Sequence, residues 1–240
     1  MPPSGGVVHW AVGGGIFVVM TRESLADGSF QAAVAAADPT MLLLTAEERA
    51  ASLRQTLGDR LGREDIWVFA YGSLIWNPLF RFEEQRVARL RGWHRRFCLW
   101  APVGRGTPER PGLMLGLERG GSCRGIAFRV AAHAPGELEL LWQREMISAS
   151  YIPRITAIET AAGPQKAIAF TINKNSYRYA RDLSEERIAS ILSTAKGEFG
   201  SSADYLMRTV SELRAAGIRD RTLERLFTSV SQQNPTSSTG

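Results

Sequence analysis

Apolar and polar positions alternate through the middle of the chain and follow a helical period near its end. Apolar or alternating segments bounded by glycine and proline predict strands at 66–70, 86–100, 113–117, 124–130, 152–160 and 166–172. Later apolar residues at helical spacing predict three helices, with Ser184 before the first, Gly217 after the second and Asp220 capping the third. Five or six mostly antiparallel strands with short links are expected to close into a small β-barrel flanked by helices, an α+β fold.

The part of the chain before these strands has a different pattern. We expect residues 1–62 to form an N-terminal extension with one helix, which a capping box of Thr45 and Glu48 begins and Gly58 ends. Residues 63–230 then form the main domain of the protein.

The two termini are interpreted separately. Residues 7–20 are apolar but too short to span a bilayer, and no basic segment precedes them, so they predict neither a membrane anchor nor a signal peptide. We interpret Met20 as the natural start, with residues 1–19 contributed by an upstream start. The polar residues 231–240 are expected to be a disordered tail.

Composition and charge limit the classes of partner. With 240 residues, of which 44% are hydrophobic, the chain can bury one sizeable core, and its net charge of +5 favours anionic partners. Nucleic acid is one such partner, but the densest basic cluster lies on a long predicted strand, where arginines on the solvent face are usually solubilising. We therefore expect no nucleic-acid binding. The arginines of this cluster are Arg86, Arg89, Arg91, Arg95 and Arg96.

Cysteine and histidine are too sparse for a disulfide framework or a metal centre. Cys98 and Cys123 each lie in an apolar, strand-like segment, and we expect buried thiols of a cytoplasmic protein. His9, His94 and His133 are scattered without the spacing of metal ligands, so no metal or other cofactor is predicted.

The first candidate for chemistry is the end of the strand at 66–70. Gly72 has no Cβ, so the chain can turn sharply there and direct consecutive backbone N–H groups at a bound molecule. Such a donor site favours a carboxylate or a developing oxyanion. The alternative is an ordinary turn. Neither spacing of a phosphate-binding glycine loop occurs here.

The second candidate is a carboxylate on an apolar helix face. Leu138, Leu141, Trp142 and Glu145 recur at the spacing of one face of a helix. Loss of hydration there is expected to raise the pKa of Glu145 above about 4.3, toward the range of roughly 6 to 7 that suits a general base. The alternative interpretation is that Glu145 closes the helix and pairs with a nearby arginine.

Several separated segments, in this order, resemble the ChaC branch of the γ-glutamylcyclotransferases. The resemblance runs from about residue 67 to residue 230, and its segments are 67–78, 105–112, 121–128, Arg144-Glu145, 200–206 and 217–220. It implies the same barrel architecture and a cytosolic enzyme that cleaves glutathione into 5-oxoproline and cysteinylglycine.

The resemblance also implies which residues form the site. Glu145 corresponds to the family's essential glutamate, and the Tyr-Gly-Ser-Leu loop is its binder of the γ-glutamyl group. The expected substrate-binding residues are Val68, Phe69, Ala70, Tyr71, Gly72, Ser73, Leu74, Tyr151 and Tyr179. For the last two tyrosines the alternative is an amphipathic core residue with a wet tip.

Two positions depart from the family pattern. Ala149-Ser150-Tyr151 lacks the usual glycine before the tyrosine, and Tyr179-Ala180-Arg181 has an arginine in place of a glycine. The Arg181 side chain could hold the glycine carboxylate of glutathione or point to solvent, and we expect it to point to solvent.

The chemistry follows from the substrate class. The α-amine of a γ-glutamyl compound can attack its own γ-carbonyl, so the effective molarity is high and no enzyme nucleophile or metal is required. We expect Glu145 to shuttle the proton while the amides of residues 72–74 anchor the γ-glutamyl unit. Two alternatives remain: a cyclotransferase acting on another γ-glutamyl amine or peptide, and a non-catalytic regulatory protein of the same fold. The sequence predicts no oligomeric state.

Overall fold

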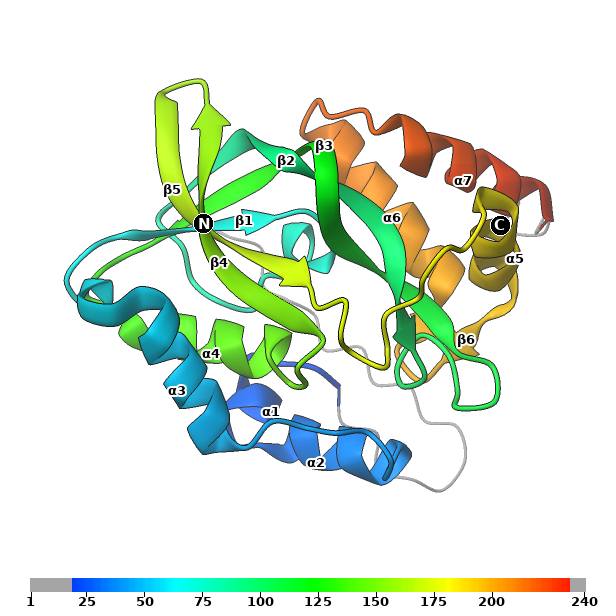
Figure 1. Ribbon diagram of the computed structural model, residues 1–240, viewed down its shortest axis with the longest axis horizontal. Helices are drawn as coiled ribbons and strands as arrows, with labels where there is room; N and C mark the ends of the chain where they lie inside the picture. The colour runs from blue at the N-terminus through cyan, green and yellow to red at the C-terminus, as the bar shows by residue number, and fades with distance from the viewer. Residues whose placement is uncertain (1–18, 234–240) are drawn as a thin grey trace.

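A closed barrel of five strands forms the centre of the protein (Figure 1). The computed structural model describes residues 19–233. Around the barrel the strands follow the order β1 (Ile66–Ala70), β3 (Gly112–Val130), β2 (Glu84–Ala101), β4 (Tyr151–Thr160) and β5 (Gly163–Ile172). Neighbouring strands are antiparallel except β1 and β5, whose parallel pairing closes the barrel. Closure gives each strand of the barrel a hydrogen-bonded neighbour on both sides.

Strand β3 corrects the prediction of two strands at 113–117 and 124–130. Residues 118–123 belong to one strand, whose pairing with β2 shifts register at Gly120 and Gly121 and then resumes at Ser122, so one long strand replaces the expected pair. Arg119, Gly120, Gly121 and Ser122 interrupt the apolar pattern because they are exposed, although the ladder continues near them.

A register shift in the pairing of β2 with β3 corrects the prediction for Arg95. The pairing with β3 shifts between Arg91 and Trp93. After the shift, the side chains around Arg95 point to the face of the sheet opposite to the one that the alternation before the shift predicts. Arg89 and Arg91 face solvent as predicted, whereas the Arg95 side chain is only 1% exposed. Its Nε lies 3.0 Å from Asp220 Oδ2, and its Nη1 donates to the Tyr71 carbonyl oxygen at 3.0 Å.

Helix α4 (Pro135–Glu145) packs against the barrel through the predicted apolar face. Leu138, Leu141 and Trp142 are buried. The Trp142 ring contacts Phe170 of β5 edge-on at 5.3 Å, and its Nε1 donates to Ser52 Oγ at 3.2 Å. Trp142 therefore joins α4 to the barrel and to the helix that contains Ser52.

The described part of the N-terminal extension, residues 19–62, contains three α-helices, whereas one was predicted. Helix α3 (Ala46–Leu57) begins at the predicted capping box, and the 3-10 turn η1 (Gly58–Arg60) follows it. Helices α1 (Arg22–Ala26) and α2 (Ser29–Ala37) were not predicted, because α1 is little more than one turn and α2 is apolar on nearly every side. The interpretation of residues 1–18 lies outside the described residues.

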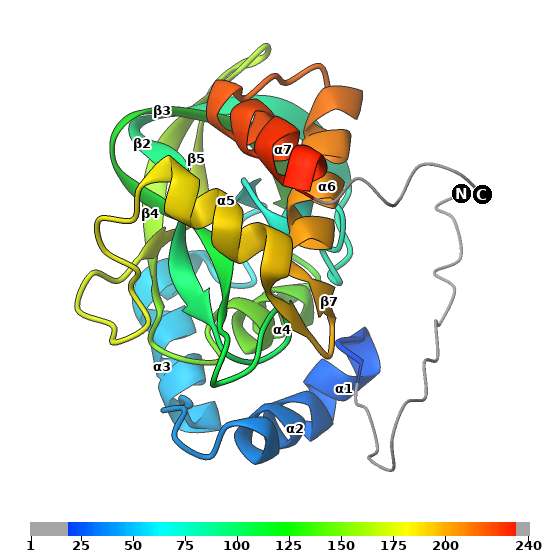
Figure 2. The same cartoon turned by 90° about the vertical axis from the view of Figure 1, so that its right-hand side faces the viewer.

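Three C-terminal helices cover one side of the barrel (Figure 2). They are α5 (Glu185–Thr194), α6 (Ser202–Ala215) and α7 (Arg221–Gln233), with a short hairpin of β6 (Lys196–Gly197) and β7 (Gly200–Ser201) between the first two. Ser184 and Asp220 cap helices as predicted. Helix α7 continues through residue 233, so the predicted tail is wrong for 231–233, and 234–240 lie outside the described residues.

The helices within residues 19–233 include none with both the length and the apolar character that crossing a bilayer requires.

Candidate active site

Strand β1 and the turn after it form one wall of the candidate site. Val68, Phe69 and Ala70 have no exposed surface, so they lie within the barrel wall and support the turn. The chain then turns through Gly72 into the 3-10 turn η2 (Ser73–Ile75). A Cβ on Gly72 would lie 2.8 Å from the Tyr205 hydroxyl, so this position requires glycine for close approach.

The amide groups at the start of this turn precede its internal hydrogen bonds. Ile75 N donates to the Gly72 carbonyl oxygen at 2.9 Å, and Asn77 N donates to the Ser73 carbonyl oxygen at 2.8 Å. The first N–H groups of a helical turn have no partner within it. Within the turn the N–H groups of residues 72–74 therefore have no backbone acceptor, and the Ser73 N–H meets the Tyr205 hydroxyl.

The end of α4 brings Glu145 to the same place. Arg144 Nη2 donates to Ser73 Oγ at 3.0 Å, and Arg144 Nη1 forms an ion pair with Glu145 Oε1. The two side chains are 5% and 12% exposed. One guanidinium therefore links the Tyr-Gly-Ser-Leu loop to the predicted catalytic carboxylate.

This ion pair changes the expected electrostatics of Glu145. Burial lowers the pKa of Arg144 to about 10, which leaves the guanidinium charged at neutral pH. A cation in contact with a carboxylate favours its ionised form. The apolar face of α4 is present as predicted, and the alternative interpretation also holds in part, because Glu145 ends the helix and pairs with an arginine.

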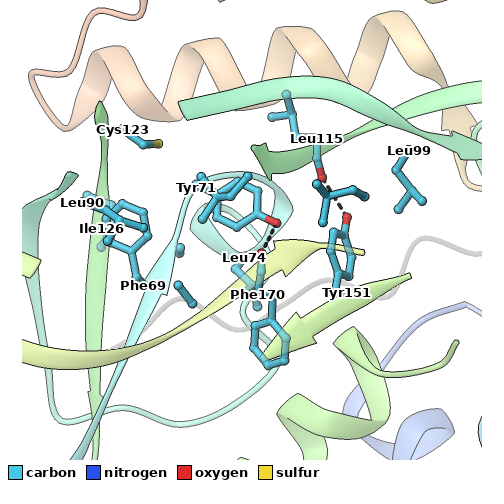
Figure 3. Packing of buried hydrophobic residues seen from close by; sticks show 14 of the residues in the cluster. Phe69, Tyr71, Leu74, Leu90, Leu99, Leu115, Cys123, Ile126, Tyr151 and Phe170 are labelled. Atoms are coloured by element: carbon cyan, nitrogen blue, oxygen red, sulfur yellow. Dashed lines mark hydrogen bonds between the residues drawn. The ribbon is translucent and has the colours of Figure 1, made fainter. Parts of the chain in front are cut away.

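Three buried tyrosines surround the Arg144 guanidinium. Tyr71 donates its hydroxyl to the Phe170 carbonyl oxygen, and Tyr151 donates to the Leu115 carbonyl oxygen, each at 2.7 Å (Figure 3). Burial raises the pKa of both phenols, so they remain protonated donors at neutral pH. Burial also raises the pKa of the third, Tyr205, although the N–H groups of Leu115 and Ser73 oppose the shift.

Tyr179 lies in a different polar cluster. It pairs with Leu99 in an isolated β-bridge, and its hydroxyl donates to Glu118. Burial, reinforced by that hydrogen bond, raises the pKa of Tyr179 to about 12. Glu118 is also bound by Arg96 at 3.1 Å. The structure therefore unites Tyr71, Ser73, Glu145 and Tyr151 but gives Tyr179 other polar partners.

Arg181 points toward solvent as predicted. Its side chain is exposed, with the guanidinium carbon 5.9 Å from the centre of the Tyr179 ring.

Comparison with known proteins identifies the family. The family of ChaC-like proteins matches residues 66–233. The chain belongs to the ChaC family. The predicted resemblance is thereby confirmed.

Individual proteins and a solved structure are also similar to this ChaC-family chain. A glutathione-specific γ-glutamylcyclotransferase of Escherichia coli is 39% identical over 214 residues, which cover 88% of this chain and 92% of the relative. Glutathione-specific γ-glutamylcyclotransferase 1 of Danio rerio is 31% identical and covers 65% and 82% of the two chains. A crystal structure of a γ-glutamyl cyclotransferase specific to glutathione from yeast matches with a TM-score of 0.64 at 17% identity, over 71% of this chain and 99% of that one. The last match confirms the fold.

Sequence reasoning did not identify three further residues at this site. Arg144, Tyr205 and Arg105 all lie in segments that carry the resemblance, yet no spacing marked their chemistry. The Arg105 guanidinium lies 5.5 Å from the centre of the Tyr205 ring and 5.9 Å from that of Trp76. Their roles depend on contacts between segments far apart in the chain.

Both cysteines of this ChaC-family protein are buried free thiols, as predicted. Burial raises the pKa of Cys98 to about 12, which suppresses its thiolate. Within residues 19–233, no three His, Cys, Asp or Glu side chains gather in a way that could hold a metal ion.

Proposed function

We propose that this chain is a γ-glutamylcyclotransferase that degrades glutathione to 5-oxoproline and cysteinylglycine. The observation that carries the proposal is the Ser73–Arg144–Glu145 link, which places an ionisable carboxylate beside the loop expected to bind the γ-glutamyl group. The printed name of the Escherichia coli relative, which aligns with 88% of this chain, supports the same reaction.

The reaction forms one carbon–nitrogen bond and breaks another. Glu145 accepts a proton from the α-ammonium of the γ-glutamyl group, and the freed amine attacks the γ-carbonyl carbon to close a five-membered lactam. Glu145 gives its proton to the cysteine nitrogen as the bond from that carbon to this nitrogen breaks. The ring nitrogen, which still carries one proton too many for a lactam, then loses it through Glu145 to the departing amine. The α-ammonium thus ends as the lactam N–H, the cysteine nitrogen as an ammonium group, and Glu145 as a carboxylate again. Each proton and electron pair is accounted for without an enzyme nucleophile.

The loop supplies stabilisation for the negative charge that develops on the γ-carbonyl oxygen. We place the γ-glutamyl group against the N–H groups at the start of η2, beside the Tyr205 hydroxyl. Donors held in position before the reaction stabilise an oxyanion without reorganising. The buried phenols of Tyr71 and Tyr151 line the same region as neutral groups, and we propose that they exclude water.

The two cysteines suggest where the enzyme acts. Buried free thiols fit a reducing compartment, and we propose the cytoplasm.

The proposal is tested by the product and by two substitutions on one helix. Purified protein is incubated separately with glutathione, γ-glutamylalanine and glutathione disulfide, and 5-oxoproline is measured by mass spectrometry. We expect release from glutathione, and a loss of about 10²–10⁴-fold in Glu145→Gln. The matched control is Glu139→Gln, which changes an exposed carboxylate of the same helix and should retain the wild-type rate.

Each outcome distinguishes the alternatives. Release only from γ-glutamylalanine would favour the cyclotransferase of another γ-glutamyl amine. No release from any of the three would favour a non-catalytic protein. A folded Glu145→Gln variant with the wild-type rate would exclude Glu145 as the proton shuttle.

A further inference from the structure

Arg144 holds a position that its contribution to folding does not explain. Its side chain is 5% exposed, and Nη1 and Nη2 bind Glu145 and Ser73. Its Nε is buried and has no hydrogen-bond partner among the described residues. A buried charge with an unpaired donor costs folding free energy, and an apolar side chain of similar volume would avoid that cost.

The contacts of Arg144 connect two parts of the site that lie far apart in the chain. Ser73 begins the turn after β1, whereas Glu145 ends α4. A planar guanidinium that binds both has one orientation, because its donors form a rigid fork. Movement of either partner would break a contact with a buried cation.

We infer that Arg144 is a positioning residue, which orients Glu145 toward the loop and holds it ionised as the base. The inference rests on the proposed function, since it assigns Arg144 a role in the proton transfer that Glu145 performs. Arg144 acts through Glu145 and Ser73.

The pH dependence of catalysis should report this role. The acid limb of kcat/KM follows ionisation of the base in the free enzyme. Removing the adjacent cation should move that limb to higher pH, because the ionised carboxylate loses a favourable neighbour. Among the described residues, the titratable groups that face Arg144 are Tyr71, which follows β1, Tyr151 of β4 and Tyr205 of α6. Behind these tyrosines lie Cys98, Arg105 and Arg178. Burial keeps the three tyrosines neutral across this range.

The test compares Arg144→Ala, Arg144→Lys and wild type. We expect Arg144→Ala to lower kcat about 100-fold with a smaller change in KM, since a misplaced catalytic group loses rate on that scale. Added guanidinium ion should restore a measurable part of kcat, whereas sodium chloride of equal ionic strength should not. Arg144→Lys retains the charge, so its acid limb should stay closer to that of wild type.

A matched control separates this role from a structural one. Arg22→Met removes a second arginine that binds a carboxylate of α4, since Arg22 Nη1 lies 2.6 Å from Glu137 Oε2 near the other end of the helix. We expect it to lower stability without shifting the acid limb and without guanidinium rescue.

The outcomes are distinct. If wild type releases no 5-oxoproline, the proposed function fails. If wild type is active, and folded Arg144→Ala keeps the wild-type pH profile or gains nothing from guanidinium, the inference about Arg144 is wrong. If Arg144→Ala does not fold, the kcat and the acid limb of Arg144→Lys are compared with those of wild type instead. A wild-type kcat in Arg144→Lys would overturn the orienting role of Arg144.

Discussion

Gly72→Ala tests whether the contact between the loop and α6 shapes the site. The added Cβ would lie 2.8 Å from Tyr205 Oη, about 0.6 Å short of ordinary contact at 3.4 Å. Tyr205 cannot retreat freely, because its ring packs edge-on against Trp76 and Phe97, each at 6.0 Å. Overpacking of this kind costs about 1–3 kcal/mol. For a chain of this size the melting temperature should fall by roughly 2–12 °C.

The same displacement should reduce catalysis. A shift of several tenths of an ångström in the loop or in the Tyr205 hydroxyl misplaces the proposed donors, and we expect kcat/KM to fall by about tenfold or more. Thermal unfolding and 5-oxoproline release measure the two effects. Gly136→Ala is the matched control, because its Cβ meets nothing within 4 Å and lies in α4, where alanine is favoured.

A double substitution identifies the cause. Tyr205→Phe removes the atom that the new Cβ would strike, so Gly72→Ala should destabilise the Tyr205→Phe protein less than it destabilises wild type. Equal costs in both backgrounds, or a Gly72→Ala variant as stable and active as wild type, would refute the steric explanation.

Three further predictions concern single side chains. Tyr151→Phe removes the buried hydrogen bond to the Leu115 carbonyl oxygen and should lower the free energy of unfolding in urea by about 1 kcal/mol; no change would show that the bond is not net stabilising. Burial raises the pKa of Glu137, but hydrogen bonds from Arg22 and the Arg81 amide outweigh it and leave that pKa below 4.5. The stabilisation that the ionised Glu137 side chain contributes is therefore fully present above pH 4.5 and is lost as the pH falls through the lower pKa of this group in the folded protein. The urea midpoint of wild type should therefore fall more steeply on acidification than that of Glu137→Gln. Cys98, with its pKa raised to about 12 by burial, should react with an aromatic disulfide at mildly alkaline pH only after unfolding in urea; rapid reaction of the native protein would contradict its burial.

The alternation of apolar residues was sufficient to predict most of the barrel. It failed where the strand continued through exposed residues, as in residues 119–122 of β3, because a stretch that is exposed on both faces carries no apolar period. It failed again at Arg95, which lies between two register shifts that change which residues of β2 face inward. Neither event is encoded in the pattern of a single segment.

The candidate site was predictable only in part, for a related reason. The helical period identified the apolar face of α4 that ends at Glu145, and the glycine identified the turn at residue 72. What lies opposite each of them depends on packing between distant segments. Arg144 was therefore recognised as a site residue only from its hydrogen bond to Ser73. Tyr205 was recognised only from the short distance between its hydroxyl and the position that a Cβ on Gly72 would take.

The N-terminal extension supports the helix that carries Glu145, although the family match begins only at residue 66. Arg22 binds Glu137 in the first turn of α4, and Ser52 of α3 accepts a hydrogen bond from Trp142 near its middle. Just beyond its last residue, Leu44 N donates to the Ile147 carbonyl oxygen at 3.0 Å. A helix that is held at its start, middle and end has little freedom to move relative to the barrel. This support from outside the matched region stabilises the helix that carries Arg144 and Glu145, whereas the contacts of Arg144 with Ser73 and Glu145 set the geometry on which the proposed proton transfer depends.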